Sequence, residues 1–156
     1  MVAKKKEVTL KFTIAEIAKA RKKLAQADNS VDEIELLHLL GYLTGEERID
    51  FLNEVWRVLK KGSKCQVVAP HWASNRAYSD LRFQWPPIVE GWLFSLNKAQ
   101  RENDPNFDKR YKCDFDFTCG YSLHPALVSR NQEFQQDAIQ WKKEAAQDLI
   151  ISLIKR

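Results

Sequence analysis

The fold is decided by residues 31–70, which read VDEIELLHLLGYLTGEERIDFLNEVWRVLKKGSKCQVVAP. Residues 31–37 predict a short apolar strand, and residues 65–70 predict a buried strand that Pro70 ends. Residues 46–59 carry an apolar stripe at helical spacing, formed by Ile49, Leu52, Val55, Trp56 and Leu59. The Lys-Lys-Gly sequence at 60–62 then supplies the cations and the glycine that commonly end a helix. This order predicts a βαβ unit with two parallel strands.

Further elements are predicted on both sides of this unit. Before it, residues 8–12 alternate like a strand, and residues 14–24 have helical spacing behind a capping box formed by Thr13 and Glu16. After it, we predict a loop at 71–87, a helix at 88–101, polar turns at 102–109, strand structure at 111–123, a helix at 129–147 and a last strand at 148–154. The order of elements predicts an α/β fold with a partly parallel sheet.

The composition is that of one folded domain spanning residues 1–156. The chain has 44% hydrophobic residues, and a chain of this length can bury a single core. No apolar run approaches the roughly 20 residues of a membrane span, and no apolar segment follows the N-terminal lysines, so we expect no membrane partner. Three cysteines without a C-x-x-C pair predict neither a disulfide framework nor a metal site, which favours a cytoplasmic location.

Positive charge is concentrated at the N-terminus. The net charge is +4, but residues 1–23 alone contain eight Lys or Arg and two Glu, which leaves a balance of −2 for residues 24–156. A basic N-terminal segment can contact the phosphates of a nucleic acid, or it can be a solvated leader. Charge alone leaves both interpretations open.

Several motifs of the chain resemble a known family. The stretch DNSVDEI at 28–34, His38, the stretch RVLKKG at 57–62 and the strand ending at Pro70 resemble the second half of a class I S-adenosylmethionine-dependent methyltransferase. In that family they mark the fourth strand, the next helix and the fifth strand. The run HWASNRAYSD at 71–80 with QWPP at 84–87 is similar to a methyltransferase-like group of phage and environmental sequences.

The resemblance covers residues 24–156 and implies a Rossmann-like, three-layer αβα fold that lacks part of the family's N-terminal half. It also implies S-adenosylmethionine as cofactor and a methyl acceptor that the sequence does not identify. The family binds its cofactor through a Gly-rich turn after the first strand and an acidic residue that ends the second. If residues 8–12 are the first strand, Lys11 to Ala15 stand in place of that turn.

A missing cofactor motif has a large energetic effect. Charge-assisted hydrogen bonds from ribose hydroxyls to a carboxylate contribute about 1.5 to 3 kcal/mol each, so their loss turns a micromolar site into a millimolar one. The sequence therefore predicts a methyltransferase-like protein with weak or absent cofactor binding and doubtful activity. The alternative is a non-catalytic remnant that binds a partner chain, or a second copy of itself, at the sheet edge left open.

Most candidate site residues follow the two predicted parallel strands, where open α/β sheets bind ligands, and Asp28 precedes the first of these strands. His38 and Asp28 are the candidates for cofactor binding. His38 can also act as a base or simply pack among the neighbouring leucines, and Asp28 can be only a turn residue.

The loop after the second strand carries the candidates for substrate binding: His71, Trp72, Arg76, Tyr78 and Asp80. An aromatic ring here can stack a flat ligand, and Arg76 can hold an anionic group. The alternative is a loop whose aromatic side chains cover the end of the sheet and in which Arg76 pairs with Asp80. No catalytic residue is assigned.

Overall fold

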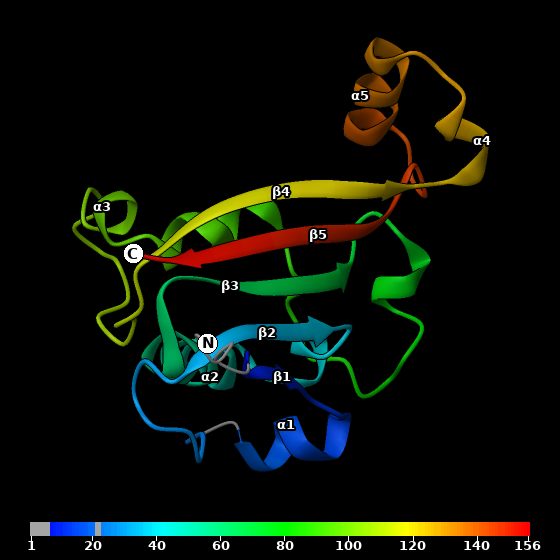
Figure 1. The fold of residues 1–156 in the computed structure, drawn as a ribbon. Coiled ribbons are helices and arrows are strands. Elements are labelled where there is room, and N and C mark those ends of the chain that lie inside the picture. The colour runs from blue at the N-terminus through cyan, green and yellow to red at the C-terminus, as the bar shows by residue number, and fades with distance from the viewer. Residues whose placement is uncertain (1–6, 21–22) are drawn as a thin grey trace, which may run out of the picture.

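The computed structural model describes residues 7–20 and 23–156. Within them lies one five-stranded sheet in the order β1-β2-β3-β5-β4 (Figure 1). The strands are β1 (Thr9–Lys11), β2 (Val31–Leu37), β3 (Leu59–Pro70), β4 (Phe115–Leu123) and β5 (Ala146–Lys155). The pairs β1–β2 and β2–β3 are parallel, whereas β5 pairs antiparallel with both β3 and β4. The predicted partly parallel sheet is confirmed.

The βαβ unit is also confirmed. Helix α2 (Gly45–Val58) connects β2 to β3, and its first turn is closed by a capping box. The Thr44 hydroxyl accepts a hydrogen bond from the Glu47 amide at 3.3 Å, and the Glu47 carboxylate accepts one from the Thr44 amide at 3.1 Å. The buried stripe of α2 packs on the sheet, where Ile34 of β2 lies beside Cys65 of β3.

The predicted glycine stop of α2 is wrong. The helix ends at Val58, and the next residue, Leu59, is already extended and begins β3. The pairing of β2 with β3 shifts between Val31, opposite Leu59, and Glu33, opposite Lys64, so β3 carries extra residues there. Gly62 lies in this bulge with a φ of +78°, a backbone conformation that glycine adopts without a Cβ clash.

Two predicted helices are shorter than expected. Residues 88–101 form a 3₁₀ helix, η3 (Glu90–Leu96), and a short helix, α3 (Lys98–Arg101). They are separated at Asn97, whose buried side-chain amide donates to the Phe115 carbonyl at 3.0 Å. Residues 129–147 contain only α5 (Gln132–Trp141), which follows the one-turn helix α4 (Pro125–Val128). In Figure 1, α4 and α5 project from the end of β4 away from the body of the sheet.

The remaining elements agree with the sequence more closely. Helix α1 (Ile14–Ala20) has the predicted capping box between Thr13 and Glu16, but the prediction extends to residues 21–22, which lie outside the described residues. Two 3₁₀ turns, η1 (Leu40–Tyr42) and η2 (Asn75–Ala77), lie in the loops after β2 and β3. No helix in the described ranges is long and apolar enough to cross a membrane.

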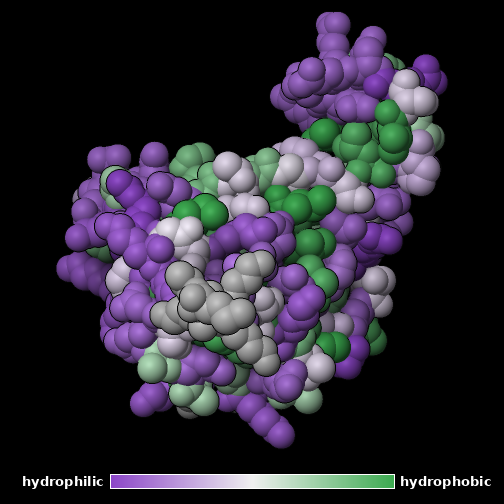
Figure 2. Space-filling view, viewed as in Figure 1, coloured by the Kyte–Doolittle hydropathy of each residue, from purple (hydrophilic) through white to green (hydrophobic). Residues whose placement is uncertain are grey.

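Helix α2 and the 3₁₀ helix η3 pack on one face of the sheet. Side chains of α2 and η3 share one buried core with strand residues such as Leu36, Val67 and Leu149. Figure 2, drawn from the same side as Figure 1, shows that apolar and polar side chains are mixed on the surface facing the viewer. On the sheet face opposite the core, Leu37 and Ile150 are exposed. The Rossmann-like α/β class is confirmed. Of the three layers expected, the described residues form the sheet and a helical layer on one of its faces.

Arg48 ties α2 to the loop that follows β3. Its side chain is 4% exposed. Its Nε donates to the Leu40 carbonyl at 3.0 Å, and its terminal nitrogens donate to the carbonyls of Pro86 at 2.6 Å and Gln84 at 2.9 Å. Burial lowers the pKa of Arg48, as it does for any cation removed from water. Main-chain oxygens of the loop therefore solvate this cation and hold the loop in place.

We expect Arg48→Met to lower the free energy of unfolding by about 2 to 5 kcal/mol, because it removes three hydrogen bonds to a charged group. Urea denaturation measures the loss, and hydrogen exchange of the Gln84 amide, which donates to the Gly41 carbonyl, should accelerate. Arg110→Met is the matched control, since its ion pairs with Asp108 and Glu46 are exposed and solvent-screened and therefore contribute little to stability. Equal losses in both variants would contradict this role.

The segment before β2 covers one edge of the sheet. Strand β1 pairs with residues 33–35 of β2, and Ile17 of α1 is completely buried. Deletion of residues 1–23 uncovers this edge and the core beneath Ile17, so we expect self-association, measured by light scattering. Ile17→Asp should act in the same direction. A truncated chain that stays monomeric with unchanged stability would show that the segment has no structural role.

Candidate functional site

Three charged or titratable side chains meet where the parallel strands end. His38 directly follows β2 with a φ of +56°, and its amide donates to the Val68 carbonyl at 2.7 Å. Its Nδ1 lies 3.9 Å from Oδ1 of Asp148, while Arg76 donates to Oδ2 of Asp148 at 2.7 Å. We call His38, Arg76 and Asp148 the ion cluster. It joins two residues selected from the sequence through a third, on β5, that was not selected.

Asp148 is incompletely satisfied. The residue is 7% exposed, and its Oδ1 accepts no hydrogen bond from the described residues. Leaving a buried acceptor unpaired costs about 1 to 3 kcal/mol. The half-exposed side chain of His38 lies beside this oxygen, so the ion cluster is reached from solvent through His38.

A second set of side chains lines a groove between the sheet and α5. The groove, about 420 Å³ in volume, is bounded by His71, Trp72, Glu90, Tyr121, Gln136, Ile139 and Gln140, and we call it the α5 groove. His71 is buried, and its Nδ1 accepts a hydrogen bond from the Ala73 amide at 3.2 Å. Its Nε2 therefore carries the proton and donates to Oε1 of Glu90 at 3.2 Å. The Tyr121 hydroxyl donates to the same oxygen at 2.9 Å.

These contacts determine the charge in the α5 groove. Burial disfavours ionisation of Glu90, but hydrogen bonds from its own backbone and from Tyr121, with the proximity of His71, outweigh burial and lower the pKa of Glu90. Burial and the Glu90 carboxylate raise the pKa of Tyr121 to about 12. At neutral pH, Glu90 is thus an anion and Tyr121 a neutral donor. The described residues that line the groove include no Lys or Arg.

The remaining candidates in the loop after β3 have local partners. The Tyr78 hydroxyl donates to the Trp72 carbonyl at 2.8 Å. Asp80 forms an ion pair with Arg82 at 2.7 Å and accepts a hydrogen bond from the Tyr42 hydroxyl at 2.9 Å. The expected alternative pairing of Arg76 with Asp80 is therefore wrong.

Asp28 lies at the opposite end of the sheet from His38. It pairs at 2.6 Å with Arg57, near the end of α2. The seven residues of β2 lie between Asp28 and His38, which at about 3.3 Å per residue separates them by roughly 20 Å. The two cofactor candidates consequently do not form one site.

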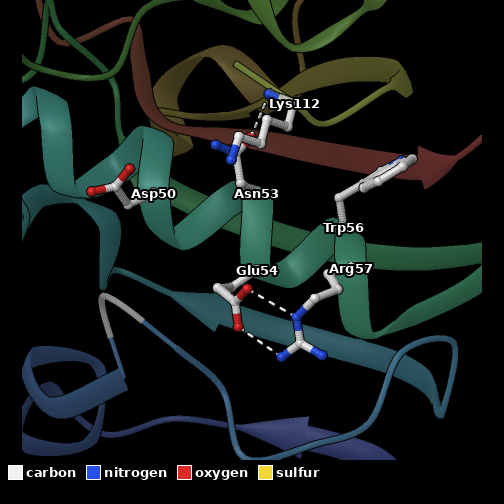
Figure 3. A pocket seen from close by; sticks show the side chains of 6 residues that line it. All are labelled: Asp50, Asn53, Glu54, Trp56, Arg57 and Lys112. Carbon is white, nitrogen blue, oxygen red and sulfur yellow. Dashed lines mark hydrogen bonds and ion pairs between the residues drawn. The ribbon is translucent and has the colours of Figure 1, made fainter. Parts of the chain in front are cut away.

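A hollow of about 510 Å³ at this amino end is lined by Asp50, Asn53, Glu54, Trp56, Arg57 and Lys112 (Figure 3). Glu54 pairs with Arg57 at 2.7 Å, and Asn53 accepts a hydrogen bond from the Lys112 amide at 2.8 Å. The Trp56 indole donates to the Asp114 carbonyl at 3.0 Å. These contacts hold α2 against the segment before β4, so we assign the hollow a structural role.

The cysteines are not placed for chemistry. Cys65 and Cys113 are buried, and burial raises the pKa of both thiols, that of Cys113 to about 12. Cys113 lies just before β4 rather than in a strand. Across residues 7–20 and 23–156, no group of three or more His, Cys, Asp or Glu side chains is placed to hold a metal ion.

Sequence reasoning missed Asp148, Glu90 and Tyr121. Asp148 had a usable signal, because it is the one acidic residue in the apolar strand AQDLIISLI at 146–154. Glu90 and Tyr121 had none, since their partners lie 19 and 31 residues away from Glu90 in the chain.

No protein-family model matches the chain, and no curated protein sequence matches it. Solved structures do match it. A SAM-dependent methyltransferase from Archaeoglobus fulgidus aligns with a TM-score of 0.57 at 15% identity, over 91% of this chain and 64% of that one. The plantazolicin methyltransferase BpumL, in complex with a pentazolic desmethylPZN analog and SAH, aligns with a TM-score of 0.51 at 14% identity, over 96% of this chain and 67% of that one. The chain has the fold of these methyltransferases over about two thirds of their length.

We expect the Tyr121 phenol to ionise near pH 12, and the absorbance difference between the parent chain and Tyr121→Phe isolates its titration. Because its pKa is higher in the folded state, the contribution of neutral Tyr121 to stability is fully present below about pH 10 and is lost as pH rises toward 12. The stability difference between the two chains should thus be constant up to about pH 10 and decline above it. A difference that does not change across that window would contradict the Tyr121–Glu90 contact.

Proposed function

We propose that this chain is an S-adenosylmethionine-dependent methyltransferase-like protein that uses the carboxyl end of its sheet to bind a methyl acceptor. One observation carries the proposal. The strand order, with two parallel steps followed by two antiparallel ones, aligns over 91% of the chain with a SAM-dependent methyltransferase structure. The ion cluster and the α5 groove both lie at the end of the parallel strands, where open α/β sheets bind ligands.

The residues after β1 do not fit the family's cofactor cradle. Only Phe12 and Thr13 separate β1 from α1, and the first turn of α1 is closed by the Thr13–Glu16 capping box. No glycine is present there to let the backbone approach a ligand. We therefore propose that residues 1–156 bind S-adenosylmethionine weakly or not at all, with His38 as the candidate contact.

A second candidate function is association without catalysis. Strand β1 pairs only with residues 33–35, so Leu36 and Leu37 have no strand partner on that side among the described residues, and Leu37 is exposed. Open strand edges pair readily with another chain. This candidate predicts that the protein acts through a partner chain or a second copy rather than through a cofactor.

We expect calorimetric titration with S-adenosylmethionine and S-adenosylhomocysteine to give no saturable heat below about millimolar ligand. Backbone amide NMR spectra at higher ligand concentration should show shifts at residues 12–15 and 38, the ends of β1 and β2. His38→Ala should remove these shifts, and Asp28→Ala, at the other end of the sheet, is the matched control.

The outcomes separate the two candidates. Shifts confined to the carboxyl ends of the strands support the methyltransferase-like proposal. No shifts at any concentration, together with concentration-dependent self-association, would replace it with the second candidate. A low micromolar dissociation constant would contradict the proposed weak binding and show that other residues replace the missing motif.

A further inference from the structure

We infer that the α5 groove binds an organic cation, an ammonium ion attached to a flat or apolar group. The inference rests on the proposed function, because it names the chemical class of the acceptor that the carboxyl end of the sheet would take. Four features of the groove carry it: one accessible carboxylate, a histidine that is hydrogen-bonded to that carboxylate from behind, an aromatic wall, and no Lys or Arg among the described lining residues.

The accessible carboxylate is that of Glu90. Both hydrogen bonds from His71 and Tyr121 go to Oε1, so among the described residues Oε2 accepts none from another side chain. The Glu90 side chain is 31% exposed and lies in the groove lining. His71 and Tyr121 therefore orient the Glu90 carboxylate from the protein side, and its exposed part faces the groove. A carboxylate held in this way can receive a charged N–H donor from a ligand.

His71 acts here as a positioning residue. Its Nδ1 accepts a hydrogen bond from the Ala73 amide, so the ring donates to Glu90 through Nε2 and orients the carboxylate. With 1% exposure it offers a ligand almost no surface. This differs from the sequence-based expectation that His71 binds substrate directly.

The aromatic wall is formed by Trp72 and Tyr121. Trp72 is 45% exposed, and its ring lies 5.5 Å from that of His71, which in turn meets Tyr121 edge to face. Cations are attracted to the faces of such rings, most strongly to tryptophan. Ile139 adds apolar surface from α5, and the volume of about 420 Å³ is in the range of small-molecule sites.

The charge balance excludes an anion as the preferred ligand. Arg76, which the sequence assigned to an anionic group, donates to Asp148 in the ion cluster and does not line the α5 groove. An anion would therefore meet the Glu90 carboxylate without a compensating cation in the groove lining. A cation gains from both the carboxylate and the aromatic wall.

Three probes that share a phenyl ring and a short chain test the inference: 2-phenylethylamine, 2-phenylethanol and 3-phenylpropionate. Each is titrated into the full chain near neutral pH and followed by NMR. We expect the amine to bind about tenfold more tightly than the alcohol, and the carboxylate more weakly than the alcohol. Equal affinities, or tighter binding of the carboxylate, would overturn the inference.

Single substitutions show which side chains produce the preference for the amine over the alcohol. Glu90→Gln retains an acceptor for Tyr121 but removes the charge, so it should sharply reduce the preference for the amine over the alcohol. Trp72→Ala should weaken the binding of both probes, and that of the amine more, because the amine also loses the cation–π attraction of the ring. Glu133→Gln is the matched control: Glu133 is an exposed acid on α5 that does not line the groove, so the substitution should leave the preference unchanged. A preference that is undiminished in Glu90→Gln would overturn the inference even if the amine binds.

The failures of the two proposals are distinguishable, because these titrations contain no cofactor. Selective amine binding without any S-adenosylmethionine shifts would leave the cation site standing and reject the methyltransferase-like function. Cofactor shifts at the ends of β1 and β2 without amine selectivity would reject the cation site alone.

Discussion

The parallel pairing of β2 with β3 is the constraint on which the rest of the molecule depends. Ile34 and Leu36 of β2 and Cys65 and Val67 of β3 are all buried on the α2 side, so a slip of one residue would expose one strand's whole apolar set. This register brings the ends of both strands to one edge. It places His38 beside Val68, whose carbonyl accepts its amide, and leaves His71 at the end of the neighbouring strand. The strand register that packs the core therefore also positions the residues of the candidate site.

The insertion of β5 between β3 and β4 then divides the site between the two faces of the sheet. Asp148 pairs with Pro70, and the next residue, Leu149, pairs with Tyr121. Because successive side chains of a strand point to opposite faces, Asp148 and Tyr121 face opposite sides. Asp148 meets Arg76 on the side away from the core, while Tyr121 meets Glu90 on the helical side. One face thus carries the Arg76–Asp148 ion pair, and the other carries the Glu90 carboxylate held by hydrogen bonds from His71 and Tyr121.

The sequence predicted the elements whose signals are local. The alternating or stripe patterns of β2, α2 and β3, and the capping box of α1, depend on neighbours within one turn or strand. Two of the failures involve distant partners. Gly62 serves a bulge against β2 rather than the end of α2, and Asn97 interrupts the predicted helix to reach Phe115. The site divides in the same way: His38 and Arg76 were selected from their positions after strands, but Asp148 became their neighbour only through antiparallel pairings that no local pattern encodes.

Strained or unpaired groups occur at both ends of the sheet, because Asn29 before β2 has a φ of +54° and Nε of Arg101 is buried without a hydrogen-bond partner among the described residues. At the amino end, Arg57 is held by Asp28, Glu54 and two main-chain carbonyls, an arrangement that stabilises and leaves little to offer a ligand. At the carboxyl end, His38 has an uncommon left-handed backbone, a buried oxygen of Asp148 is unpaired among the described residues, and Oε2 of Glu90 accepts no hydrogen bond from another described side chain. Strained and unpaired groups cost free energy of about 1 to 3 kcal/mol each and cluster where proteins bind ligands. The fold alone assigns no activity, and the carboxyl end is the proposed ligand site because a partly exposed carboxylate lines a groove there.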